Sequence, residues 1–455
     1  MKKLLFTAIS LLLILGMCFG LVACNDTPPP TPTPDGTPDE TPDETPDETP
    51  DETPDETPDE TPDETPDETP DETPTDNLNF TYELNSRGNG YVITGIAEGV
   101  TMTEAVIPAT YNGKNVTGFD AKGFIGNSIT AFSSENNSEF KVVDGVLYNK
   151  SGKKLLCFPG GKTDTTLTIT KDVTSIGDYA FAGNTKLTEI NLYKAVALGE
   201  GCFKNCSSLA TLTTHTDAIP SACGAEAFAG TAFYANEANW VDGILYLSAG
   251  AVTGGNRLLL IEAKDTVSGD LVLDSLVTYI GDRAFDNCTG LTSIKFGYYL
   301  LGIGAYAFDG CSELISADFY THLPIDIPVK EIGAGAFRNC SKLEGFTIPS
   351  VSQINEYTFE NCTSLKYFVI DPAAFTGLSF TKDSLKNCGL THVFYKVDSH
   401  TEAQLDAIKD YNDPTLIGSF PNSRKHYYDE AVHQGQQSNG HYYWRFVDGK
   451  PVIWE

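Results

Sequence analysis

Cysteine is the residue best equipped for chemistry in this 455-residue chain, which contains eleven of them. Six recur at one position of a repeated motif, namely Cys206, Cys288, Cys311, Cys340, Cys362 and Cys388. The motif cysteines could form a ladder of buried thiols or a set of disulfides, which exported proteins often carry. Nine cysteines remain after residue 24. This odd number, and the common direction of the motif's side chains, favour thiols.

No catalytic signature accompanies these cysteines. Cys202 and Cys206 have a spacing that could suit a metal, but no second pair or nearby histidine completes a ligand set. Gly302-x-Gly304 and Gly333-x-Gly335 begin a dinucleotide-binding pattern without its third glycine. Esterase, zinc-protease and phosphate-loop motifs are absent from the sequence. We therefore predict a non-enzyme with no metal and no cofactor, and we disfavour a glycan-cleaving enzyme with paired carboxylates.

The first 24 residues predict export and lipid attachment. Lys2 and Lys3 precede an apolar run that ends in Leu21-Val22-Ala23-Cys24. This ending resembles the lipobox of bacterial lipoproteins, which implies cleavage after residue 23 and a diacylglyceryl group on Cys24. The alternative is an uncleaved membrane helix, since the apolar run is long enough to span. The polar segment that follows favours the lipoprotein, anchored on the extracellular side of the membrane.

Residues 24–79 predict a disordered, lipid-anchored stalk. Nine consecutive Thr-Pro-Asp-Glu units fill Thr37 to Glu72. Proline at every fourth position prevents a helix, and no apolar side chains are available to form a core. The extended reach is on the order of 160 Å. An acidic metal-binding tail is the alternative, which we disfavour because the prolines hold the carboxylates apart.

The charge of the remaining chain limits its partners. Residues 77–455 carry a formal charge of −13 out of −32 for the whole chain. Clustered Lys and Arg, which nucleic-acid binding requires, are missing, so we exclude a nucleic-acid partner. The membrane contact is therefore predicted to come from the N-terminal lipid alone.

Residues 80–396 contain the repeat Ile-Gly-x-x-Ala-Phe-x-Asn/Gly-Cys-x-x-Leu-x-x-Ile-x-Ile/Phe. Its phenylalanines are Phe181, Phe203, Phe228, Phe285, Phe308, Phe337 and Phe359. One copy is too short to bury its own apolar face, so the copies must stack. Leu-x-x-Ile-x-Ile indicates a short strand, and Ala-Phe-x-x-Cys indicates one helical turn. Gly177, Gly281 and Gly333 are expected to permit the bends between the strand and the helical turn. The prediction is a solenoid of short parallel strands and helical turns.

A longer internal repeat lies over the short one. Residues 155–181 align with residues 259–285 at a constant offset of 104. Val143–Tyr148 also matches Val241–Tyr246, and each segment indicates a strand, a glycine-containing turn and a returning strand. A hairpin insert therefore interrupts the solenoid twice.

These columns resemble the BspA-type leucine-rich-repeat family of bacterial surface proteins. Val106–Thr117 is similar to the family's usual first repeat, and Tyr443–Gly449 with Trp454 is similar to a common closing segment. The resemblance implies a leucine-rich-repeat solenoid and adhesion to host or matrix proteins or to other cells. Cys223, in the isoleucine column, departs from the pattern, as does the missing cysteine after Phe228.

Residues 397–455 break the repeat and predict a capping segment. Thr401–Tyr411 indicates a short helix, and His441–Val447 with Val452–Trp454 indicates a hairpin around Asp448-Gly449. Solenoids need such caps to cover the last coil. An aromatic carbohydrate-binding platform is the alternative.

The function predicted from the sequence is binding or adhesion at the cell surface, with an extracellular protein or glycan as partner. Outward positions of the strands would supply the contacts, and these are Glu189, Asn191, Ser293, Lys295, Ser316, Asp318, Tyr367 and Val369, with Tyr320 nearby. Each of them could equally be a solvated strand position. A passive structural component of a surface layer is the alternative function.

Overall fold

The computed structural model describes residues 78–214, 219–248, 257–319, 329–349, 351, 353–370, 379–381, 383–395, 424–428, 442–447 and 450–453. Cys24, residues 1–77 of the predicted signal peptide and stalk, Tyr320 and the predicted helix Thr401–Tyr411 lie outside these ranges. Within them, no helix combines the length and apolar character needed to cross a membrane.

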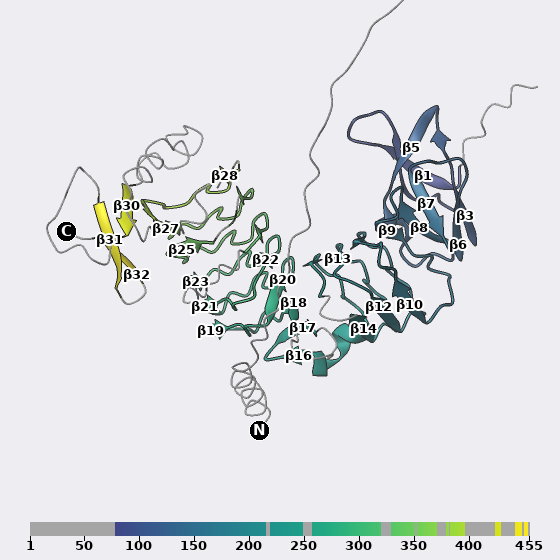
Figure 1. Ribbon diagram of the computed structural model, residues 1–455. Coiled ribbons are helices and arrows are strands. Elements are labelled where there is room, and N and C mark those ends of the chain that lie inside the picture. The colour runs from purple at the N-terminus through teal and green to yellow at the C-terminus, as the bar shows by residue number, and fades with distance from the viewer. Residues whose placement is uncertain are drawn as a thin grey trace, which may run out of the picture. The chain divides into compact units, whose positions relative to one another are not determined.

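The described chain begins with a small N-terminal sheet (Figure 1). Its order is β1-β2-β5-β4, with bounds Phe80–Leu84, Tyr91–Ile96, Lys114–Phe119 and Thr110–Tyr111. Beside it, β3 (Glu104–Ile107) pairs in parallel with β6 (Ala131–Ser134). This region corresponds to the first repeat expected from the sequence.

The next region, which we call the first block, consists of coils that alternate between two sheets. The inner sheet is β7 (Phe140–Val143), β8 (Val146–Asn149), β9 (Lys154–Cys157), β11 (Ser175–Ile176), β13 (Ala197–Leu198) and β15 (Ala222–Cys223). The outer sheet is β10 (Thr166–Ile169), β12 (Glu189–Leu192) and β14 (Thr211–Thr214). Strands β7 to β9 are antiparallel and the later neighbours are parallel.

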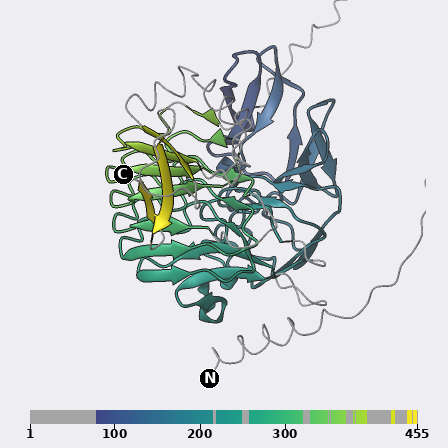
Figure 2. The same cartoon turned by 60° about the vertical axis from the view of Figure 1, so that its left-hand side comes forward.

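The second block repeats this plan. Its inner sheet is β16 (Trp240–Val241), β17 (Ile244–Ser248), β18 (Leu258–Ala263), β20 (Val277–Ile280), β22 (Gly302–Ile303) and β24 (Glu331–Ile332). Its outer sheet is β19 (Gly269–Val272), β21 (Leu291–Lys295) and β23 (Ser316–Asp318). Figure 2 shows the coils of this region as a stack of green strands. The two predicted hairpins are confirmed, and each continues into an antiparallel meander, β7–β8–β9 or β16–β17–β18.

The chain ends in a further sheet that continues the outer strands. Its order is β25 (Gly345–Ile348), β27 (Tyr367–Ile370), β29 (His392–Tyr395), β30 (Arg424–Tyr428), β31 (Tyr442–Val447) and β32 (Lys450–Ile453). Strands β26 (Gln353–Ile354) and β28 (Ser379–Phe380) form a separate parallel pair. The predicted terminal hairpin is confirmed, because Val447 pairs with Lys450. The sequence did not reveal that β30 and β31 join β29 in parallel.

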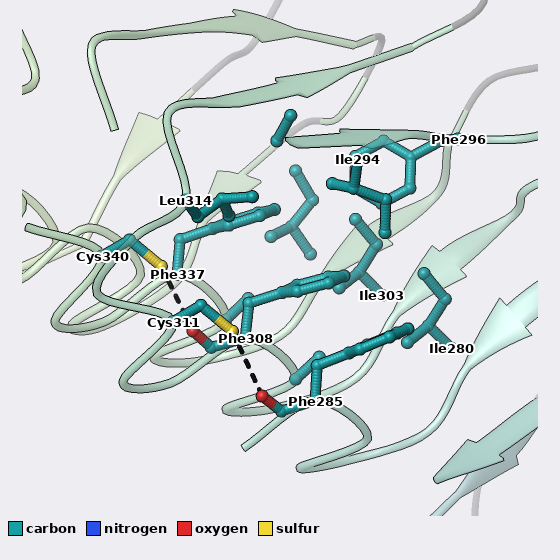
Figure 3. Close-up of a cluster of buried hydrophobic side chains, with 14 of the residues drawn as sticks. Ile280, Phe285, Ile294, Phe296, Ile303, Phe308, Cys311, Leu314, Phe337 and Cys340 are labelled. Carbon is teal, nitrogen blue, oxygen red and sulfur yellow. Dashed lines mark hydrogen bonds between the residues drawn. The ribbon is translucent and has the colours of Figure 1, made fainter. Parts of the chain in front are cut away.

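The repeat columns pack as the stacked-coil prediction required. Phe285, Phe308 and Phe337 stack with ring centroids 4.9 and 5.1 Å apart and interplanar angles of 9° and 3°. Ile280, Ile294, Ile303 and Leu314 surround them, each with 0% exposure (Figure 3). The leucine-rich-repeat solenoid is confirmed as the fold.

The predicted helical turn within each repeat is wrong. Described helices are limited to η1 (Ala121–Phe124), α2 (Ala232–Ala235) and η2 (Glu237–Asn239), and the Ala-Phe-x-x-Cys segments form successive turns. A residue with positive φ lies on either side of the buried phenylalanine and prevents a helix. Around Phe308, for example, φ is +56° at Tyr306 and +73° at Gly310. The second of these positive-φ positions lies directly before the cysteine. Gly and Asn tolerate positive φ best, which explains why the motif has one or the other there. Asn287, Asn339 and Asn361 all have φ near 60° there.

The turns of adjacent coils are hydrogen-bonded to one another. The backbone N–H groups of Phe285 and Asn287 donate to the carbonyls of Ala307 and Asp309 on the next coil, both at 2.7 Å. The intervening Asp286 N–H instead closes a turn onto the Arg283 carbonyl at 3.0 Å. Every second N–H therefore links two coils, and the segment makes a ladder without being a strand.

The glycine that follows the isoleucine column serves a different purpose from the one we predicted. Gly177, Gly281 and Gly333 are absent from the described glycines with positive φ. A Cβ at Gly333 would overlap the Ala305 backbone nitrogen, and a Cβ at Gly177 would lie 3.0 Å from the Leu155 carbonyl oxygen. These glycines are needed because neighbouring coils approach too closely for a side chain.

The two meanders separate the three large hydrophobic clusters of the described residues, and Val369 and Phe394 form a fourth, small one. In the second meander, Leu245 and Leu259 belong to the first block's cluster, whereas Ile244 and Leu260 belong to the second block's cluster. In the first meander, Leu147 faces the N-terminal cluster. Its neighbours Val146 and Leu155 face the first block's cluster. Because successive strand residues point to opposite faces, each meander is a wall shared by two cores.

Candidate functional site

The outer sheet of the first block presents uncharged polar side chains around one carboxylate. Glu189 pairs with Thr166 and Thr211, and Asn191 lies between Thr168 and Thr213. The alternating Ile190 and Leu192 are buried at 0 and 1% exposure. Glu189 and Asn191 therefore occupy the outward positions that the alternation predicted, although both are half-buried. The Thr213 hydroxyl contacts Asn191 Oδ1.

The outer sheet of the second block is charged. Ser293 lies between Asp270 and Ser316, and Lys295 lies between Val272 and Asp318. Asp270 Oδ1 accepts hydrogen bonds from Ser293 Oγ at 2.7 Å and Thr292 Oγ1 at 2.9 Å. The hydrogen bonds from Ser293 and Thr292 lower the pKa of Asp270, so this carboxylate stays ionised well into the acidic range.

Lys295 adds a positive charge to this sheet, in the row Val272–Lys295–Asp318. Its side chain is exposed, and its positive charge acts on both Asp270 and Asp318. Next to it, Val272 is 71% exposed. Ser293, Lys295, Ser316 and Asp318 are thus brought together on one sheet face, as predicted. Apart from these four, the predicted residues lie on other sheets or outside the described residues.

Tyr367 and Val369 lie on the later sheet, and Val369 requires a correction. Val369 does point away from Phe368 along the strand, but it is only 2% exposed, because it packs with Phe394 from the next coil. It is therefore unavailable as a contact residue. Tyr367 is half-buried. Its ring covers Gly345 and meets Phe394 edge-on at 5.8 Å.

The cysteines confirm the thiol ladder. All nine in the described residues are free. Each motif thiol donates to a backbone carbonyl one coil earlier, for example Cys311 Sγ to the Phe285 oxygen and Cys340 Sγ to the Phe308 oxygen, both at 3.2 Å (Figure 3). Burial raises the pKa of the Cys206 thiol to about 12 and that of Cys288 to about 11. These are structural thiols that resist ionisation.

No metal-ligating group of three or more His, Cys, Asp or Glu side chains occurs among the described residues.

Carboxylates do gather where the blocks meet, and burial raises the pKa of both Glu262 and Asp282. Their partners are structural. Tyr234 donates its hydroxyl to Glu262 at 2.8 Å, and Asp282 Oδ1 accepts the Ala305 N–H at 2.7 Å.

A cation–aromatic stack on the turns was missed by the sequence reasoning. The guanidinium carbons of Arg283 and Arg338 each lie 4.8 Å from the Tyr306 ring centroid. Arg338 also donates Nε to Asp309 Oδ1 at 3.1 Å. The available signal was positional, because Arg283 and Tyr306 both stand directly before the alanine of the motif. The repeat motif itself leaves that position free to vary.

A solenoid whose coils align Ile, Phe, Cys and Leu columns in this way is of the leucine-rich-repeat class. Residues 156–235 and 268–391 match the model of the BspA type leucine rich repeat region, in six copies. The repeat region of this chain is therefore similar to the BspA-type leucine-rich-repeat family. No curated protein matches the chain.

Several solved structures are similar to this chain. A leucine rich cell surface protein from Faecalibacterium prausnitzii is 19% identical, with 72% of this chain and 96% of that one covered and a TM-score of 0.32. A leucine-rich repeat protein from Bacteroides ovatus is 16% identical, covering 77% and 98%, with a TM-score of 0.27. The pneumococcal vaccine antigen PcpA is 18% identical, covering 74% and 95%, with a TM-score of 0.25.

Proposed function

We propose that this protein is a lipid-anchored cell-surface binding protein whose leucine-rich-repeat solenoid recognises an extracellular protein or glycan. The observation that carries the proposal is the row on the second outer sheet. Lys295 and Asp318 lie side by side in register with exposed Val272, and all three side chains are exposed. A parallel sheet that sets a cation, a carboxylate and an apolar side chain in one row suits recognition of an extended surface.

The first block offers a natural comparison surface. Its equivalent row is Thr168, Asn191 and Thr213, in the same parallel register but without charge. If the solenoid served only to fill a surface layer, nothing would require a charged row in one block alone. We therefore assign the binding role to the second block's outer sheet.

Binding is tested with the full-length protein and its Lys295→Glu variant against purified matrix proteins and defined glycans, by biolayer interferometry. Contacts at the centre of such a face are worth about 1–2 kcal/mol, so affinity should fall about tenfold. Lys171→Glu makes the same charge change at an exposed site of the first block and serves as the matched control. Absence of any ligand across the panel would instead favour the passive surface-layer component, and glycan cleavage would favour an enzyme.

Anchoring is tested separately. The lipobox-like ending at Cys24 and the acidic Thr-Pro-Asp-Glu segment support a solenoid held away from the membrane. Cys24→Ala should abolish incorporation of labelled fatty acid and release the protein from the membrane fraction. Continued labelling of the variant would contradict lipid attachment at Cys24.

A further inference from the structure

Strand β19 is the terminal strand of the second block's outer sheet. Within the described residues it pairs with β21 and with no strand on its other side. The backbone N–H groups of Gly269 and Leu273 donate to carbonyls of the next coil at 2.8 and 3.0 Å. Because backbone groups alternate in direction along a strand, those of Asp270 and Val272 point to the open side. This edge therefore offers backbone donors and acceptors to a further strand.

The core beneath the sheet is less well covered at this edge than further in. Leu271 is half-buried, whereas Ile294 and Ala317, which continue its row on β21 and β23, are 0 and 1% exposed. A Cβ added at Gly269 would meet no atom within 4 Å. A further strand with an apolar side chain beside Leu271 would complete the cover.

The outward side chains of this edge are acidic, apolar and acidic. Asp270, Val272 and Asp274 are all exposed, and the leucines between them point inward. Neither aspartate takes part in an ion pair of the described residues. Lys295 on β21 offsets part of the charge of Asp270, but residues 265–282 contain no Lys or Arg. The complementary pattern on a neighbouring strand is basic, apolar and basic.

The first block has an equivalent edge without this charge. Strand β10 is also the terminal strand of its outer sheet, and its exposed side chains are those of Thr166, Thr168 and Thr170. Pairing of β19 with β19 of a second copy would bring aspartates against aspartates, and like charges on neighbouring strands repel. Charge complementarity thus selects a basic partner, and it selects β19 over β10.

We propose that an extended segment of a partner protein joins β19 as an added strand, with basic side chains beside Asp270 and Asp274 and an apolar one beside Val272. The inference rests on the proposed binding function and narrows its partner to a protein with an exposed basic segment. In this mode of recognition, main-chain hydrogen bonds supply affinity and alternate side chains supply specificity.

The probe is a fluorescein-labelled peptide with Arg-Leu-Val-Leu-Arg at its centre, and its binding to the full-length protein is measured by fluorescence anisotropy. We expect saturable binding that weakens with added salt. Replacing both arginines of the peptide by glutamate should weaken binding about tenfold. The double variant Asp270→Asn, Asp274→Asn should also bind the arginine peptide more weakly, whereas Asp172→Asn, at an exposed site of the first block, should not.

The edge itself is tested with proline. Val272→Pro removes the N–H that points to the open side, and proline is tolerated on an edge strand at such a position. The variant should bind the arginine peptide at least tenfold more weakly, whereas Thr168→Pro, the same change at the equivalent position of β10, should bind it normally. Circular dichroism of both variants checks that they are folded.

A change in the peptide avoids any effect on folding of the protein. Only alternate N–H groups of an added strand face β19. Methyl groups on the backbone nitrogens of both peptide leucines, or instead on that of the valine, should therefore differ in effect: one placement abolishes binding and the other preserves it. Equal effects of the two placements would contradict strand addition.

No binding by the wild type, or unchanged binding by Val272→Pro, would overturn the inference. So would dimerisation of the protein that Val272→Pro abolishes, in the absence of peptide binding, because the occupant would then be a second copy. If a matrix protein loses affinity for Lys295→Glu but not for Val272→Pro, the inference fails and the proposed function stands. If the peptide binds β19 as expected and Lys295→Glu changes the affinity of no ligand, the assignment to the Lys295 row fails instead.

Discussion

The two meanders begin from closely matched hairpins yet separate different kinds of core. Both turn at Asp-Gly with positive φ at each residue, Asp144 and Gly145 in one and Asp242 and Gly243 in the other. The first meander divides the N-terminal cluster from the first block, and the second divides the first block from the second. A short turn sequence thus sets the hairpin, while the residues on the two faces of its strands determine what the hairpin separates.

The second meander needs more complete apolar faces than the first, because it separates two solenoid cores. Leu258 to Ile261 is an uninterrupted apolar run, as expected for a strand that is covered on both faces. Before this meander in the sequence, α2 carries Phe233, which is 8% exposed and belongs to the first block's core. The first meander has strand β6 in the corresponding place and a partly buried Leu156. The comparison indicates that a wall between two solenoid stacks needs complete apolar faces, and it can be tested residue by residue.

The largest effect should come from a pair of adjacent leucines on opposite faces of the second meander. Leu259 and Leu260 are both 0% exposed. Leu259→Ala and Leu260→Ala should each lower the free energy of unfolding by about 2–5 kcal/mol through cavity formation. Hydrogen exchange should then rise in the first block for Leu259→Ala and in the second block for Leu260→Ala. Equal effects on both blocks from either variant would contradict the shared-wall interpretation.

A smaller loss should follow substitution of the glycines between coils. Gly333→Ala forces a Cβ onto the Ala305 backbone nitrogen, so the coils must separate, at a cost of about 1–3 kcal/mol. Gly177→Ala in the first block places its Cβ at 3.0 Å from the Leu155 oxygen and should cost less. Chemical denaturation of both variants measures the difference, and the reverse order would show that Gly333 is not limited by coil spacing.

Alkaline pH should destabilise the thiol ladder. Burial raises the pKa of Cys206 to about 12, above the ordinary value of 9.0. The unfolded chain therefore loses protons first, and stability that is complete below pH 9 should decline as the pH rises from 9 towards 12, by about 1.4 kcal/mol per pH unit for each thiol. Denaturant titrations of the wild type and Cys206→Ser should show a shallower alkaline loss in the variant. Identical pH profiles would mean that this thiol does not contribute.

The smallest effect is expected from exchanging equivalent surface residues between the blocks. Thr168 and Val272 occupy corresponding outer-strand positions, and Val272 is 71% exposed. Thr168→Val and Val272→Thr should each change the free energy of unfolding by less than about 0.5 kcal/mol. Thermal unfolding can establish this, and a larger change at Val272 would reveal that this side chain has a structural role.

The repeat columns made the solenoid predictable, because a side chain that recurs every coil can only be buried by its own copies. Phe285, Phe308 and Phe337 behaved as expected for that reason. The turn geometry was not predictable from periodicity, since Ala-Phe-x-x-Cys has helical spacing and only the positive φ values at Tyr306 and Gly310 prevent a helix.

The candidate surface was predicted less completely. Strand alternation placed Ser293, Lys295 and Asp318 on the outer sheet, but it could not reveal that Phe394 covers Val369. The exposure of Tyr193 and Tyr299 was not predicted, because exposure in a turn depends on how the neighbouring coils end there. No periodic pattern records it.

The most direct test of the three-core account is native-state hydrogen exchange of the wild-type protein at increasing denaturant. Amides of the N-terminal region, the first block and the second block should exchange as three groups, each with its own opening free energy, and the boundaries should fall at the two meanders. A single opening free energy shared by the amides of residues 80–370 would contradict the division of the core.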